Sequence, residues 1–91
     1  MKTLLVGYDL DKPAQDYKAL VGAIKAAGSW WHYLDSTWLV VTELTAEGLR
    51  NELRGHVDAS HDKLLVIDVS GDAAAWVGFP NKASDWLKEN L

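Results

Sequence analysis

The sequence predicts an α+β fold in which two helices cover one face of a four-stranded antiparallel sheet. Four short runs of β-branched, aliphatic and aromatic residues alternate with two stretches of helical periodicity, in the order strand, helix, strand, strand, helix, strand. The 91 residues, of which 48% are hydrophobic, suffice for one small core. Because the chain has no cysteine, that core depends on packing or assembly and not on disulfides. We therefore expect a single domain over residues 1–91, with residues 72–91 as a C-terminal extension.

The first half of the chain contains a strand, a helix and a hairpin. Residues 3–9 are almost continuously apolar, which is typical of a central strand that is covered on both faces. Pro13 favours a helix start and Gly28 favours a helix end. The apolar residues between them recur at helical spacing: Tyr17, Leu20, Val21, Ile24 and Ala27. Residues 30–34 and 38–42 are rich in β-forming residues and are separated by polar residues, so they predict a β-hairpin.

The second half repeats the helix and the strand and then adds a tail. Thr45 is a good N-cap for a helix over residues 46–57, whose apolar positions fall on one side. Residues 63–69 predict a fourth strand. Beyond it, residues 73–79 are apolar but short, and residues 81–91 predict a last helix. The first six elements match the βαββαβ order of a ferredoxin-like sandwich, in which the first and third strands are central.

The charge balance and the absence of long apolar stretches restrict the function. Nine Lys and Arg residues against thirteen Asp and Glu residues give a net charge of −4. Nonspecific nucleic-acid binding draws most of its affinity from Lys and Arg, so the sequence argues against it but leaves room for a local basic patch. No apolar run reaches the ~18 residues that a membrane helix needs, and the N-terminus does not resemble a signal peptide. We therefore expect a cytoplasmic protein without a membrane partner.

Both faces of the predicted sheet are apolar, which indicates an interface. In the first strand Leu4 and Val6 alternate with Leu5, and hydrophobic residues also occupy both faces of the third strand. Two helices cover only one face, and a large exposed apolar patch usually marks an interaction site. We therefore expect a homodimer in which the uncovered faces meet. The residues expected at that interface are Trp31, Tyr33, Trp38, Val40 and Trp76.

Asp9 is the first candidate for chemistry, because it ends an apolar central strand, where a carboxylate reaches the margin of the sheet. Mg²⁺ prefers carboxylate oxygens and keeps several waters, so one Asp9 from each half of a symmetric dimer can hold one ion. Such an ion activates water for attack on a phosphodiester. Asp9 is therefore a candidate catalytic and metal-binding residue. The alternative is structural, with Asp9 accepting hydrogen bonds from backbone amides of the loop over residues 10–13.

The histidines offer two further candidate sites. His56, Asp58, His61 and Asp62 are of types that ligate zinc or nickel, but their spacing fits no helix-borne metal motif. The alternative for these four residues is an ordinary solvated loop. His32 has the chemistry of a general acid or base, and its alternative is a hydrogen-bonded structural role.

Aromatic and basic residues add two patterns. The aromatic residues of the hairpin are Trp30, Trp31, Tyr33 and Trp38. They suit base stacking, but the charges nearby are acidic, which favours packing in a core or an interface. Arg50 and Arg54 lie one helical turn apart and could grip an anion. The alternative is a solvated face on which Glu47 and Glu52 neutralise them.

Short motifs in the first 38 residues resemble a known group of proteins. These motifs are Val6-Gly7-Tyr8-Asp9-Leu10, Tyr8-Asp9-Leu10-Asp11-Lys12-Pro13, Trp30-Trp31-His32 and Tyr33-Leu34-Asp35-Ser36-Thr37-Trp38. Together with the strand order, they resemble the CRISPR-associated Cas-two superfamily of ferredoxin-fold proteins, which includes the virulence-associated protein D toxins. The likeness is nearest to short bacterial and phage proteins of the SinR family and covers about three quarters of the chain.

The resemblance implies a homodimer and, in some members, Mg²⁺-dependent cleavage of RNA or DNA through the aspartate that aligns with Asp9. Other members act as noncatalytic scaffolds for an integrase, so a scaffold or a regulatory protein of a defence or toxin–antitoxin locus is the implied alternative. The nucleases commonly carry Arg or Lys soon after the aspartate, whereas this chain has Asp11 followed by Lys12. Residues 74–79 would correspond to the family's C-terminal strand, which pairs with the partner subunit, with the last helix as an addition.

Overall fold

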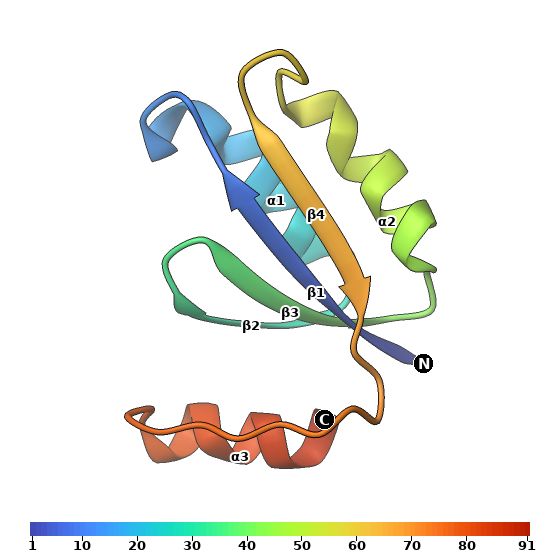
Figure 1. Ribbon diagram of the computed structural model, residues 1–91, viewed down its shortest axis with the longest axis vertical. Helices are drawn as coiled ribbons and strands as arrows, with labels where there is room; N and C mark the ends of the chain where they lie inside the picture. Colours follow the sequence, from blue (N-terminus) through green and yellow to red (C-terminus); the bar gives the residue numbers. More distant parts are fainter.

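Four antiparallel strands form one sheet in the order β2-β3-β1-β4 (Figure 1). The computed structural model describes the backbone of residues 1–91 and their side chains except those of residues 14 and 15. The strands are β1 (Lys2–Asp9), β2 (Ser29–Leu34), β3 (Thr37–Thr42) and β4 (Lys63–Asp68). The helices are η1 (Ala14–Tyr17), α1 (Lys18–Ala26), α2 (Ala46–Leu53), η2 (Arg54–His56) and α3 (Asn81–Asn90). The α+β class and the ferredoxin-like sandwich are confirmed, with β1 and β3 in the centre.

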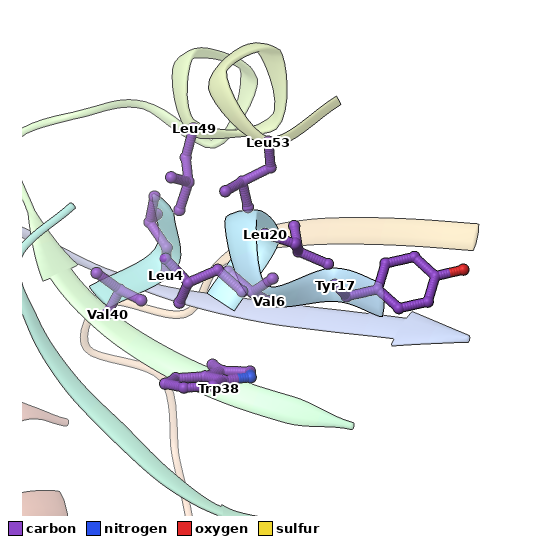
Figure 2. Close-up of a cluster of buried hydrophobic side chains, with 9 residues drawn as sticks. Leu4, Val6, Tyr17, Leu20, Trp38, Val40, Leu49 and Leu53 are labelled. Atoms are coloured by element: carbon purple, nitrogen blue, oxygen red, sulfur yellow. The ribbon is translucent and has the colours of Figure 1, made fainter. Parts of the chain in front are cut away.

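One face of the sheet packs against α1 and α2 and forms the main core. The register pairs Leu4 with Val40 and Val6 with Trp38, so these four side chains share one face of the two central strands. Figure 2 shows them together with the helical residues that cover them. The buried members of this cluster are Leu4, Val6, Tyr17, Leu20, Ile24, Trp38, Val40, Leu49 and Leu53. Burial of this apolar surface is the main force that holds both helices on the sheet.

Trp38 and Val40 therefore do not lie on the face that we expected them to share with a second copy. Both are fully enclosed beneath the helices, and the Trp38 indole Nε1 donates a hydrogen bond to the Tyr8 hydroxyl over 2.9 Å. The structure therefore corrects the expectation that Trp38 and Val40 lie at a dimer interface. The physical reason is that both faces of β3 are apolar, so alternation alone cannot tell which face the helices cover.

The second face of the sheet is covered in part by α3. A row of side chains crosses this face, because Trp31 pairs with Leu39, Leu39 with Leu5, and Leu5 with Ile67. Ala83 and Leu87 of α3 bury the first two members of the row, and the Trp31 indole Nε1 donates to the Ala83 carbonyl over 3.2 Å. Figure 1 shows α3 apart from α1 and α2, on the side of β2.

On β4 the second face stays open in this chain. Leu65 is 56% exposed and Ile67 is 43% exposed, although their partners Gly7 and Leu5 on β1 are half-buried. The second face thus has two parts, a β2–β3 part that α3 covers and a β1–β4 part that we call the open strip, made of Leu5, Gly7, Leu65 and Ile67.

Residues 74–79 form no strand in the structure, unlike the C-terminal strand that the resemblance implied. Trp76 and Phe79 instead pack into the cluster beneath α3, and the Trp76 indole Nε1 donates to the Ser84 hydroxyl over 2.9 Å. Gly78 has a φ of 92°, which interrupts an extended backbone. The segment is therefore held by its aromatic side chains and not by a β-ladder. Among the described residues, no helix has the length and apolar character needed to cross a membrane.

Candidate functional site

Asp9 lies exposed at the end of β1, where the register places it opposite Lys63 of β4. Residues paired across neighbouring strands share a face, so Asp9 and Lys63 continue the open strip by one more pair. Lys12 lines the same cleft as Asp9, which has a volume of about 310 Å³. Asp9 therefore has one lysine opposite it on β4 and another that lines the same cleft.

Lys63 is the residue of this site that sequence reasoning missed. It stands more than fifty positions after Asp9 and becomes its neighbour only through the antiparallel pairing of β1 with β4. The predicted strand order contains that pairing, so the signal was available. Register alone decides that Lys63, and not another residue of β4, meets the carboxylate.

The loop after β1 is held by Asp62 and not by Asp9. The Asp62 Oδ1 atom accepts hydrogen bonds from the Asp11 backbone N–H over 2.9 Å and from the Tyr17 hydroxyl over 2.6 Å. Among the described side chains, Asp9 accepts no bond from the loop over residues 10–13. The structural role considered as the alternative for Asp9 was to accept hydrogen bonds from the loop after β1. Asp62, from the loop before β4, takes this role instead.

Asp62 is a buried carboxylate with a complete set of partners. It is 7% exposed, and its Oδ2 atom accepts a bond from the Asp58 backbone N–H over 2.8 Å. These bonds, first that of the Asp11 N–H and then that of the Tyr17 hydroxyl, stabilise the charged form and lower the pKa of Asp62. The same contact raises the pKa of Tyr17, because an ionised phenol would face the carboxylate. Asp62 thus fastens the loops at this end of the sheet.

In the histidine cluster, the His61 ring contacts the Asp58 carboxylate. The His61 Nδ1 atom lies 3.0 Å from the Asp58 carboxylate, and this carboxylate raises the pKa of His61. The pKa of Asp58 is lowered first by the Ser60 backbone N–H and then by His61. His56 lines the same cleft, which has a volume of about 230 Å³. Over the part of the chain that the structure describes, no three His, Asp or Glu side chains converge as metal ligands.

The aromatic hairpin has a structural role on both faces of the sheet. His32 stacks on Trp38 with ring centroids 3.8 Å apart, and its Nδ1 atom lies 3.1 Å from the Thr37 carbonyl oxygen. Trp31 meets Phe79 edge to face at 5.0 Å beneath α3. Trp30 is partly exposed, with the Lys25 ammonium 4.9 Å from its ring. Of the expected interface residues, Trp31 is buried by the chain itself, Trp76 is half-buried, and Tyr33 stays exposed.

A third cleft brings together the basic residues that the sequence left ambiguous. Arg50 and Arg54 of the second helical segment line it together with Lys63 at the start of β4, and its volume is about 400 Å³. Lys63 thus belongs both to this cleft and to the surroundings of Asp9. The arginine pair of the second helical segment and the surroundings of Asp9, which are separate in the sequence, therefore meet at Lys63.

Comparison with known proteins gives a likeness of fold. No model of a protein family matches this chain, and no curated protein matches it either. Six chains among the solved structures match. One of them is described as a hypothetical protein, TT1823 from Thermus thermophilus, with a TM-score of 0.65 and 22% sequence identity over 87% of this chain and 94% of that chain. This likeness supports the α+β fold and says nothing about activity.

Proposed function

We propose that this protein is a homodimeric, Cas-two-like nuclease in which Asp9 of each copy takes part in cleaving RNA or DNA. The observation that supports this proposal is the position of Asp9, exposed at the margin of the open strip with Lys63 opposite it and Lys12 beside it. Lysine ammonium groups attract phosphate, and a carboxylate next to them has the chemistry that a hard divalent cation requires.

The carboxylates available near Asp9 decide how a metal ion could be bound. One chain offers the Asp9 carboxylate on the face of the open strip, with Asp35 lining the same cleft, and Mg²⁺ is held in proteins by one or two carboxylates and several waters. Asp9 of one copy and Asp9 of a second copy would together meet that requirement. When bound, Mg²⁺ supplies the activation of water and the neutralisation of charge on the phosphate. Lys12 and Lys63 would hold the substrate phosphate next to the two carboxylates.

The open strip supports the dimeric part of the proposal. Leu65 and Ile67 are exposed apolar side chains on the same face as Asp9. Burying them against a second copy would remove apolar surface from water and would bring the Asp9 margins of the two sheets toward one another. The interface proposed here is narrower than the whole second face, because α3 already covers Trp31 and Leu39.

A noncatalytic scaffold, or a regulatory protein of a defence or toxin–antitoxin locus, is the second candidate function. It is favoured by the net charge of −4 and by Asp35, which lines the same cleft as Asp9. Both would repel the phosphates of a substrate.

Cleavage of labelled single-stranded RNA and DNA, with Mg²⁺ or with EDTA, separates the two candidates. We expect Mg²⁺-dependent cleavage by the wild type and a loss of about 10²–10³-fold in Asp9→Asn, as is typical when a group that stabilises transition-state charge is removed. Asp85→Asn, an exposed carboxylate of α3, is the matched control and should cleave like the wild type. Equal cleavage by Asp9→Asn would refute the nuclease proposal.

Light scattering tests the dimer on the same samples. We expect a mass of about twice the 10.1 kDa of one chain, and a mass near one chain for Leu65→Glu. Val77→Glu is the control, because Val77 is 92% exposed and lies outside the open strip. A wild-type mass of one chain at micromolar concentration would contradict the dimer and with it the shared metal.

A further inference from the structure

A groove runs along the free edge of the sheet, between β4 and α2. The cleft of Arg50, Arg54 and Lys63 lies at the end of the groove where the chain passes from α2 to β4. Figure 1 shows this connection between the two elements at the top of the molecule. A second cleft of about 220 Å³ follows it along the strand and shares Arg50 and Leu64 with the first. The two clefts form one groove, which is basic at the start of β4 and is lined beyond it by apolar residues together with Glu47 and Arg50.

β4 is an edge strand whose outer side has no strand neighbour. The sheet order ends with β4, and its ladder partner is β1 on the inner side. Among the described residues, no backbone group of Leu64–Ile67 bonds to any segment other than β1. The outward N–H and C=O groups of the strand are therefore free to pair with another extended chain. Residues 74–79 are not available for this, because they pack on the other face beneath α3.

The groove concentrates positive charge in an acidic protein. Arg50 lies 3.8 Å from Glu47, a long and exposed ion pair, and donates to the Asn51 side chain over 2.9 Å. Within the part of the chain that the structure describes, neither Arg54 nor Lys63 has a carboxylate within 4.0 Å. Asp62 also lines the groove, but both of its oxygen atoms are engaged in the hydrogen bonds described above.

We infer that this groove binds an extended acidic segment of a partner protein, which adds to β4 as an antiparallel strand. The backbone of the segment would pair with β4, its apolar side chains would contact Leu64 and Val66, and its carboxylates would face Arg54 and Lys63. A strand that lies between a sheet edge and a helix is a known way of binding peptides. The six residues of β4 span about 20 Å, so a segment of six to eight residues fits.

The same features favour a peptide over a nucleic acid. Among the described residues that line the groove, none is an aromatic side chain on which a base could stack. A free strand edge offers a ladder of hydrogen bonds that a peptide backbone matches and a phosphodiester backbone does not. The inference goes beyond the proposed nuclease, because it uses the edge of β4 and not the carboxylate of Asp9.

Fluorescence anisotropy with the labelled peptide Ac-TVTVEVEE tests the inference. We expect saturable binding that weakens with salt, because the charges are exposed. Arg54→Gln should weaken it by up to about 5-fold, as for a single surface ion pair. A peptide with proline in place of its second valine keeps the charge but loses ladder bonds, and should bind about 10-fold more weakly. Lys82→Gln removes the same charge from α3 and should bind like the wild type.

Four results would overturn the inference. Equal weakening by Lys82→Gln would show that only the net charge matters. Equal binding of the proline peptide would show attraction without strand pairing. The third result is that single-stranded RNA displaces the peptide, binds more tightly than the peptide and loses affinity in Arg54→Gln. That result would assign the groove to a nucleic acid. In two-dimensional NMR spectra of the wild type, the amide signals of residues 63–68 should shift on peptide addition, and unchanged signals there would also refute it.

Discussion

Replacing Gly28 by alanine should destabilise the protein strongly, because a side chain at this position would meet the backbone of a neighbouring strand. Gly28 lies between α1 and β2, where the backbone of β3 passes close to it. A Cβ atom at this position would overlap the Val41 carbonyl oxygen and would lie 3.0 Å from its carbonyl carbon and 3.6 Å from the Thr42 Cα. These atoms belong to the backbone of a central strand, so no side-chain rotation relieves the overlap.

The size of the destabilisation depends on which atoms must move to relieve the overlap. Overpacking a well-packed site costs about 1–3 kcal/mol, and backbone atoms of the sheet yield less readily than side chains, so we expect about 2 kcal/mol or more. For a chain of this size that loss lowers Tm by about 8 °C or more. Urea unfolding followed by circular dichroism measures the free energy of unfolding, and an unchanged m-value would show that the native state remains compact.

Gly22→Ala is the matched control for this substitution. Gly22 lies inside α1, and a Cβ atom there would meet nothing within 4 Å. Alanine should therefore stabilise the helix by about 0.5–1 kcal/mol, because it loses less backbone entropy on folding. The two variants should move the unfolding midpoint in opposite directions. A Gly28→Ala protein as stable as the wild type would refute the close approach of the two backbones.

Two further predictions concern the loops and α3. The Asp62 carboxyl has a pKa below its usual value of 3.8, so its contribution to stability is present above about pH 4 and is lost as the pH falls through the lowered pKa. Asp62→Asn should therefore be less stable than the wild type at pH 7. The urea midpoints of the two proteins should converge once the pH falls below the lowered pKa, whereas a constant difference would contradict the prediction. Leu87→Asp places a charge in the cluster around Trp31, so α3 should detach at a cost of about 2–5 kcal/mol and the tryptophan emission should shift to longer wavelength. Lys88→Asp, on the exposed side of the same helix, should leave the emission unchanged, and an unshifted spectrum of Leu87→Asp would contradict the packing of α3.

Periodicity was sufficient to predict the order of the elements, because each one has a local signal. The apolar run of β1, the helical spacing of α1 and the Thr45 cap all correspond to elements in the structure, and the Thr45 hydroxyl accepts a bond from the Gly48 N–H over 3.0 Å. The second long helix was predicted to reach residue 57, but it ends at Leu53 and tightens into η2. Helix ends depend on the last few hydrogen bonds, which side-chain patterns do not encode.

The placement of the candidate residues was harder to predict, because it depends on contacts between distant segments. Trp38 was assigned to the wrong face, since β3 is apolar on both sides and only packing against α1 and α2 selects one. Asp9 was found from its position at the end of a strand, but Lys63 was missed because strand register is not written in local composition. The role of Asp62 was also missed, since its three donors come from the loop after β1, from η1 and from the loop before β4.

The coverage of Trp31 by α3 changes what a dimer of this protein would have to bury. The sequence suggested a second chain as the cover for the aromatic residues of this face, but Ala83 and Leu87 of the same chain provide that cover. Of the apolar side chains that remain exposed on this face, Leu65 and Ile67 lie on the strand that carries Lys63, opposite Asp9, whereas Tyr33 lies beside Trp31 and Phe79. A dimer that buries Leu65 and Ile67 therefore has Asp9 at its rim, whereas a dimer through α3 would leave Asp9 far from the second copy. The oligomeric state of the Leu65→Glu variant therefore tests both the interface and the shared metal, because two Asp9 residues can share a metal only in the dimer that buries Leu65 and Ile67.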